Sequence, residues 1–146
     1  MPAAGERGGE NRDYRQLFHD SYLRCVVSDQ DGFFKRFYQL FTAADPEISK
    51  AFSNTDMDLQ VSRLQESLLH MIDFSSSKVA SERMLRIAAY HGSAGMDIPV
   101  YMFDLWMDRL VATLQERDTR FNAHIETAWR VFLAPGIAFM KSHCSR

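Results

Sequence analysis

The chain has few cysteines, no long apolar segment and no large excess of charge of either sign. Its 146 residues include only two cysteines, Cys25 and Cys144, with no CxxC spacing, so free thiols in a reducing compartment are expected rather than a disulfide framework. The longest apolar runs are far shorter than a bilayer span, and the N-terminus has no apolar signal core. We therefore expect a cytoplasmic protein that does not enter a membrane.

Neither sign of charge dominates the sequence. The formal net charge is −2, which leaves no basic footprint for nucleic acid or for an anionic membrane surface. The glycine-rich, charged residues 1–11 contain little that could be buried, and we expect them to form a disordered tail. Residues 12–146 are then expected to form one domain.

Strand patterns are missing as well. No segment alternates apolar and polar residues long enough for a strand, so the sequence predicts an all-α protein of seven or eight helices. Short corners between long helices favour crossed packing over a simple four-helix bundle. The helices are expected near 12–27, 34–41, 46–52 and 56–74, then in one that ends at His91, in 99–115, and in a last one from Asp118–Thr119 to Met140 with a kink at Pro135–Gly136.

The helix boundaries are indicated by capping residues. Pro46 suits the first turn of a short helix, and residues 53–55 offer N-caps for the next long helix. Residues 75–77, all serine, suit a loop or a cap for the helix that carries His91.

Aromatic residues, in contrast to cysteines, are abundant in this chain. Eleven Phe, five Tyr and two Trp, with 46% hydrophobic residues overall, are enough to fill one core and to pack against a flat ligand.

His91 is the residue that most suggests chemistry. Met84, Ile87, Ala88 and His91 recur at helical spacing, so an imidazole projects from the last turn of an apolar stripe. Two interpretations follow: a ligand to haem iron, or a buried histidine bonded to a backbone carbonyl.

Several landmarks in order extend this pattern into a family resemblance. The chain from Tyr14 to Met140 resembles the bacterial single-domain globins and the globin domain of flavohaemoglobins. The resemblance depends on Phe37-Tyr38, Asp45-Pro46-Glu47, Phe52, Gln60 with Leu64, His91 with Gly95, and Tyr101.

The resemblance implies a globin fold around haem b, with His91 as the iron ligand and a carbonyl near Ile87 fixing its ring. It implies that Tyr38 and Gln60 donate hydrogen bonds to a gas bound on the opposite side. The residues expected to contact the haem are Phe52, Leu64, Ile87, Met96, Ile98 and Tyr101. Read without the family, Tyr38, Phe52 and Tyr101 would be ordinary core residues, and Gln60 would face solvent.

Other side chains receive lesser roles. Flavohaemoglobins pair the tyrosine at the position of Tyr101 with a glutamate, but Cys144 stands where that glutamate is expected. A weak peroxidase activity is therefore expected at most, rather than a strongly activated, peroxidase-like iron. Arg83 and Arg86 are candidate partners for the haem propionates. The four other histidines (His19, His70, His124 and His143) are expected at the surface or edge.

Four functions remain open. The first is reversible binding of dioxygen and of other diatomic gases such as NO or CO. The second is nitric oxide dioxygenation, which would need an external reductase because the sequence has no GxGxxG motif. The third is a gas or redox sensor that acts through a partner protein, and the fourth is an interaction module without haem. A monomer and a homodimer are both compatible with the pattern.

Overall fold

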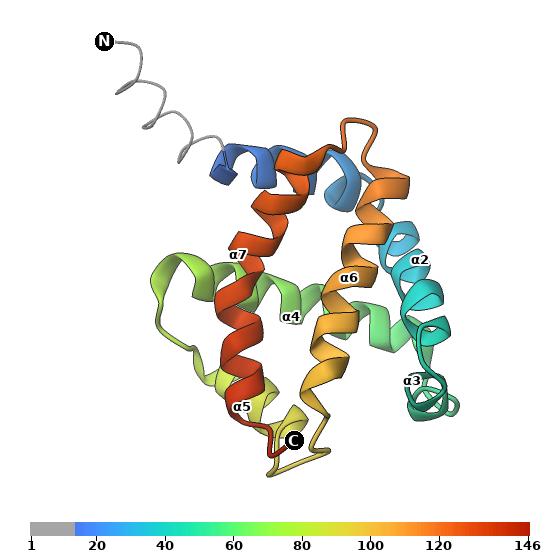
Figure 1. The fold of residues 1–146 in the computed structure, drawn as a ribbon, viewed down its shortest axis with the longest axis vertical. Helices are drawn as coiled ribbons and strands as arrows, with labels where there is room; N and C mark the ends of the chain where they lie inside the picture. The colour runs from blue at the N-terminus through green and yellow to red at the C-terminus, as the bar shows by residue number, and fades with distance from the viewer. Residues whose placement is uncertain (1–13) are drawn as a thin grey trace.

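The structure, a computed structural model, describes residues 14–146, which form an all-α fold without strands (Figure 1). The all-α prediction is confirmed for this part of the chain; the expected tail at 1–11 and the domain start at residue 12 lie outside it. After a helical stretch at 14–21, the elements are η1 (Tyr22–Val26), η2 (Val27–Asp29), α2 (Gln30–Ala43), α3 (Pro46–Ala51), α4 (Met57–Ser77), α5 (Glu82–His91), α6 (Val100–Arg117) and α7 (Ala123–Ser142). Within residues 14–146, no helix is both long and apolar enough to cross a membrane.

The long helices cross one another rather than forming a parallel bundle. Helices α6 and α7 contact each other, and α4 crosses behind both of them in Figure 1. Helix α2 packs along α6, while the short α5 lies against α4 and α7. The predicted crossed packing is confirmed, and it brings α2, α4 and α5 around one core.

The core is built from the apolar faces that helical spacing predicts. On α4, Leu64, Leu68 and Met71 are buried, as the i, i+4, i+7 pattern requires. Trp129 of α7 and Leu110 of α6 are fully buried. A Cβ added at Gly136 would lie 3.1 Å from the Met71 side chain, so glycine allows α7 to approach α4 closely.

Five helices begin with a side-chain cap that accepts a backbone N–H, which satisfies one of the amides left unpaired in the first turn. The expected restart at Asp45-Pro46 is confirmed: Asp45 caps α3, and Pro46 occupies its first turn. The five caps are Asp29, Asp45, Asp56, Ser81 and Asn122.

Some predicted boundaries were wrong. Residues 75–77 are the last turn of α4 rather than a loop, and Ser81 is the serine that caps α5. The cap of α4 is Asp56 rather than a residue of 53–55. The last helix begins after Asn122 and not at Asp118–Thr119, because the Asp118 carboxylate is buried against Arg24 and Ser21.

The first predicted helix is less regular than its pattern suggested. The α-helix at 14–21 passes into the π-helical turn η1 and then into the 3₁₀ turn η2. At this point Ser21 and Arg24 both donate hydrogen bonds to Asp118, a contact 97 and 94 positions away along the chain. The apolar spacing of residues 12–27 carries no information about that partner.

Candidate functional site

His91 is the last residue of α5, and its ring is held by its own helix. Nδ1–H donates a hydrogen bond to the carbonyl oxygen of Ile87 at 2.8 Å, the carbonyl one turn back that the sequence suggested. Burial lowers the pKa of His91, although the bond to Ile87 acts in the opposite direction. The ring is therefore neutral near pH 7, with its proton on Nδ1 and the Nε2 lone pair available.

Helix α5, which carries this ring, is short and is held by a side-chain cap, by buried residues and by contacts at its end. Ser81 caps the helix by accepting from the Met84 amide at 3.0 Å, and Met84 and Ala88 are fully buried. Gly92 ends it with an extended backbone. Two neighbouring groups bond the His91 carbonyl: the Ile98 amide at 2.8 Å and the Cys144 thiol at 3.8 Å.

Tyr38 of α2 and Gln60 of α4, the two polar residues that the resemblance assigns to one side of the haem, contact each other. Gln60 Nε2 donates to the Tyr38 hydroxyl oxygen at 3.2 Å. Burial raises the pKa of Tyr38 to about 12, while the bond from Gln60 lowers it slightly. The phenol therefore keeps its proton at neutral pH, and that proton remains available for a further acceptor.

Aromatic rings surround this pair. The Phe52 ring centroid lies 5.5 Å from that of Tyr38, in an edge-on arrangement, and 6.3 Å from that of Phe41. Leu64, one turn beyond Gln60, is buried. Such surroundings exclude water and so strengthen any hydrogen bond that Tyr38 donates.

The remaining residues that were expected to contact the haem differ in burial. Ile87 and Ile98 are half-buried, whereas Met96 and Tyr101 are exposed. The Tyr101 hydroxyl donates to Asp45 Oδ2 at 3.2 Å, which ties the start of α6 to the start of α3. This acceptor is a partner that the sequence pattern did not suggest.

The lesser candidates lie at or near the surface. Arg83 pairs with Glu66 at 2.8 Å, and Arg86 is exposed. His19 and His124 are exposed as expected, whereas His70 and His143 are half-buried. Both cysteines are free thiols, with Cys25 buried and Cys144 half-buried.

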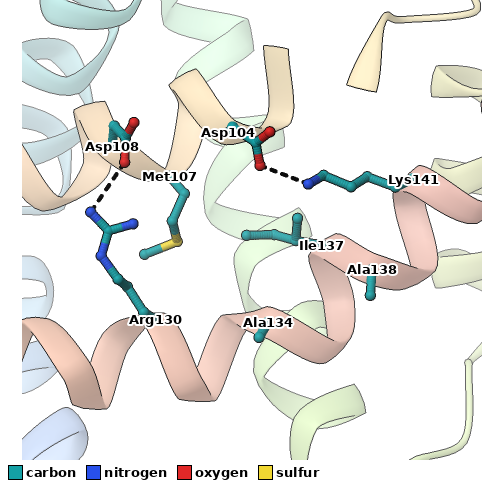
Figure 2. A pocket seen from close by; sticks show the side chains of 8 residues that line it. All are labelled: Asp104, Met107, Asp108, Arg130, Ala134, Ile137, Ala138 and Lys141. Carbon is teal, nitrogen blue, oxygen red and sulfur yellow. Dashed lines mark hydrogen bonds and ion pairs between the residues drawn. The ribbon is translucent and has the colours of Figure 1, made fainter. Parts of the chain in front are cut away.

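A shallow hollow lies elsewhere, between α6 and α7 (Figure 2). Its volume is about 270 Å³, and Met107 and Ile137 give it apolar walls. Ion pairs join α6 to α7 across it, from Asp108 to Arg130 at 3.1 Å and from Asp104 to Lys141 at 2.6 Å. No pattern in the sequence indicates this hollow, because it depends on the side-by-side placement of two helices.

Comparisons with known proteins place this geometry in a family. No protein-family model matches the chain, and no curated protein matches its sequence. A crystal structure from Pseudomonas aeruginosa PAO1, described as structurally highly homologous to a human hemoglobin, matches with a TM-score of 0.81. The match has 32% sequence identity and covers 90% of this chain and 99% of the Pseudomonas chain. With the all-helical fold and the order of its landmarks, the chain belongs to the globin family, as a globin of the bacterial single-domain kind.

Proposed function

We propose that this globin holds haem b through His91 and binds dioxygen, or another diatomic gas such as NO or CO, on the side of Tyr38 and Gln60. The observation that carries the proposal is the unpaired Nε2 atom of His91, which the 2.8 Å bond from His91 Nδ1 to the Ile87 carbonyl leaves available. It fixes both the tautomer and the ring orientation that an imidazole needs as a metal ligand. Among residues 14–146, His91 Nε2 has no hydrogen-bond partner, so its lone pair is free to bind a metal ion.

The donor set fits haem better than a bare metal ion. Within the described chain, no three His, Cys, Asp or Glu side chains gather to hold a metal. A single neutral imidazole is sufficient when a porphyrin supplies the other four ligands. Phe52, Leu64, Ile87 and Ile98 are apolar side chains that would contact the porphyrin, together with the more exposed Met96 and Tyr101. When bound, haem iron supplies an open coordination position for the gas.

Tyr38 and Gln60 would stabilise that gas from the opposite side. An O–H or N–H donor in a water-poor pocket favours a ligand that carries partial negative charge, and these two side chains would supply such donors to a bound gas. Gln60 already donates to the Tyr38 oxygen, which directs the phenol proton away from Gln60. Gln60 would therefore orient Tyr38, and Tyr38 would donate its proton to the gas.

Replacement of His91 tests the proposal. The purified wild-type chain, reconstituted with haemin and reduced, is expected to give the absorption spectrum of a five-coordinate ferrous haem and a CO complex. His91→Gly should lose that spectrum and recover it when free imidazole is added. His124→Ala, which removes an exposed histidine of α7, should leave it unchanged. A His91→Gly spectrum identical to that of the wild type would exclude this ligand assignment.

Nitric oxide dioxygenation with an external reductase is a second candidate. The pair of the buried Tyr38 and the half-buried Gln60 favours it, because the reaction requires dioxygen to be held until nitric oxide arrives. The oxygenated protein should then convert nitric oxide to nitrate, with sustained turnover when a reductase and NADH are supplied. Oxygen binding without such turnover would leave reversible gas binding as the function.

A further inference from the structure

The segment after α7, residues 143–146, is bonded to the corner between α5 and α6; we call this segment the strap. The Ser93 amide donates to the His143 carbonyl at 2.8 Å, and the Val100 amide donates to the Arg146 carbonyl at 3.0 Å. Between them, Asp97 accepts from the Ser145 amide at 3.0 Å and from the Ser145 hydroxyl. The strap thus spans the corner from one end to the other.

The corner itself has an unusual backbone at the residue that the strap bonds. Asp97 has φ of 50°, in the left-handed region that favours glycine and is tolerated by Asp and Asn. Its amide donates to the Gly92 carbonyl, and the next amide, Ile98, donates to the His91 carbonyl, both at 2.8 Å. A change in the conformation of Asp97 therefore reaches the peptide group of His91 within one residue.

Packing limits how the corner could rearrange. A Cβ at Gly92 would overlap the His143 carbonyl oxygen, so strap and corner are in direct contact where α5 ends. The Cys144 thiol also lies against the His91 carbonyl at 3.8 Å. Bonds from the corner and from the strap therefore both end on the backbone of His91.

We propose that Asp97 is a positioning residue for His91: by bonding the strap it holds the corner, and the corner fixes the last turn of α5 and the direction of the imidazole. This inference rests on the proposed function of His91 as the iron ligand. If the strap were loosened, the His91 peptide would sample more conformations, and the bond from imidazole to iron would vary in tilt and length.

Two substitutions at Asp97 separate the bonding role from the backbone role. Both glycine and asparagine tolerate the left-handed backbone. Asparagine keeps an oxygen that accepts from the Ser145 amide, whereas glycine keeps no acceptor at all. Asp97→Gly should therefore release the strap, and Asp97→Asn should largely retain it. Asp108→Asn, which alters an acidic residue of α6 that pairs with Arg130 of α7, is the matched control.

Amide hydrogen exchange of the isolated protein tests the strap, with or without haem. Asp97→Gly should speed exchange of the Ser93 and Val100 amides about 10-fold, and Asp97→Asn and Asp108→Asn should change it less than about 2-fold. Ser145→Ala, which removes only the hydroxyl bond, should give an intermediate increase and replaces Asp97→Gly if that variant does not fold. Unchanged exchange in Asp97→Gly, or in Ser145→Ala where it stands in, would overturn the proposal.

The iron–histidine stretching band in the resonance Raman spectrum of the ferrous haem-loaded protein tests the positioning. Asp97→Gly, or Ser145→Ala where it replaces that variant, should shift or broaden the band, while Asp97→Asn and Asp108→Asn should match the wild type. Faster exchange with an unchanged band would make the strap a purely structural contact and overturn the positioning role. Absence of the band in the wild type would refute the proposed function, and with it the positioning role, while the exchange result would still report the strap.

Discussion

At the scale of single residues, the direction of the hydrogen bond between Gln60 and Tyr38 decides which of the two polar groups is free to donate. Gln60 Nε2 donates to the Tyr38 oxygen at 3.2 Å, so the phenol uses its acceptor side on the protein and keeps its donor side free. Burial raises the pKa of Tyr38 to about 12, which keeps that proton in place throughout the neutral range. Gln60 therefore orients Tyr38, and only the Tyr38 proton is left for a further acceptor.

This order predicts unequal effects of two substitutions. Tyr38→Phe should raise the dioxygen dissociation rate about 10-fold, because one hydrogen bond of about 1.4 kcal/mol is lost. Gln60→Leu should raise it less, since Tyr38 can still donate. Stopped-flow displacement of dioxygen by CO measures both rates. Tyr22→Phe, at a half-buried tyrosine beside Trp129, should leave the rate unchanged. Equal rates for Tyr38→Phe and the wild type would count against the donor role of Tyr38.

At the scale of elements, α5 is short and depends on its two ends. It has only ten residues, too few to be stable as an isolated helix, so capping and burial must hold it. Ser81 satisfies a backbone donor at its start. At its end, Gly92 lies against the strap. Both ends of α5 are therefore held by contacts, and His91 lies at the second end.

Loss of the starting cap should weaken the whole domain slightly. Ser81→Ala is expected to lower the free energy of unfolding by about 1 kcal/mol, because the Met84 amide loses its acceptor. Urea denaturation followed by circular dichroism measures the change. Ser76→Ala, at an exposed position in the last turn of α4, should be neutral or slightly stabilising. A Ser81→Ala midpoint equal to the wild type would mean that the cap contributes nothing.

The other end of α5 should be more sensitive. Gly92→Ala is expected to cost about 1–3 kcal/mol, because its methyl group meets the backbone carbonyl of His143, which cannot move aside as a flexible side chain could. Ala94→Ser, in the same corner but exposed, should be nearly neutral. Thermal unfolding of the two variants provides the comparison, and similar melting temperatures for both would contradict close packing at Gly92.

At the scale of the whole molecule, a buried polar cluster joins the beginning of the chain to its last two helices. Asp118, which follows α6, accepts from Ser21 Oγ at 2.7 Å and from Arg24 Nε at 2.6 Å. Trp129 Nε1 of α7 donates to the same Ser21 hydroxyl at 2.9 Å. Burial alone would raise the pKa of Asp118, but the bonds from Arg24 and Ser21 outweigh it and the pKa is lowered.

Asp118 should therefore couple stability to pH. Its contribution is fully present above the unfolded-state pKa of about 3.9 and is lost as pH falls from there through the lower folded-state pKa. Asp118→Asn should cost about 2 kcal/mol at pH 7 and should weaken the loss of stability below about pH 4. Denaturation midpoints measured from pH 7 to pH 3 report both effects.

A surface carboxylate provides the contrast. Asp104→Asn, which removes the exposed ion pair with Lys141, should change stability by less than about 1 kcal/mol at pH 7. If Asp118→Asn behaved like Asp104→Asn at every pH, the buried cluster would have no special role.

Sequence patterns predicted the elements well where burial and capping are local. The spacing of Met84, Ala88 and His91 predicted the buried face of α5, and Asp45-Pro46 predicted the start of α3. The predictions failed where a distant partner decides. Residues 75–77 continue α4 although serine suits loops, and Asp118 is a buried acceptor rather than a helix cap. Local propensity is a weak prior, and tertiary contacts override it.

The sequence alone determined that this protein is helical and that His91 projects from an apolar helical face, because both conclusions follow from the periodicity of the chain. The resemblance of its landmarks to those of globins added Tyr38 and Gln60 as polar side chains to examine, and the match to the Pseudomonas structure shows the family. Only the tertiary structure decided that Gln60 bonds Tyr38, that Tyr101 bonds Asp45 and that the strap bonds Asp97. The reason is physical: a hydrogen bond depends on two atoms meeting within about 3 Å, and partners 22 to 56 positions apart meet only after the helices have packed.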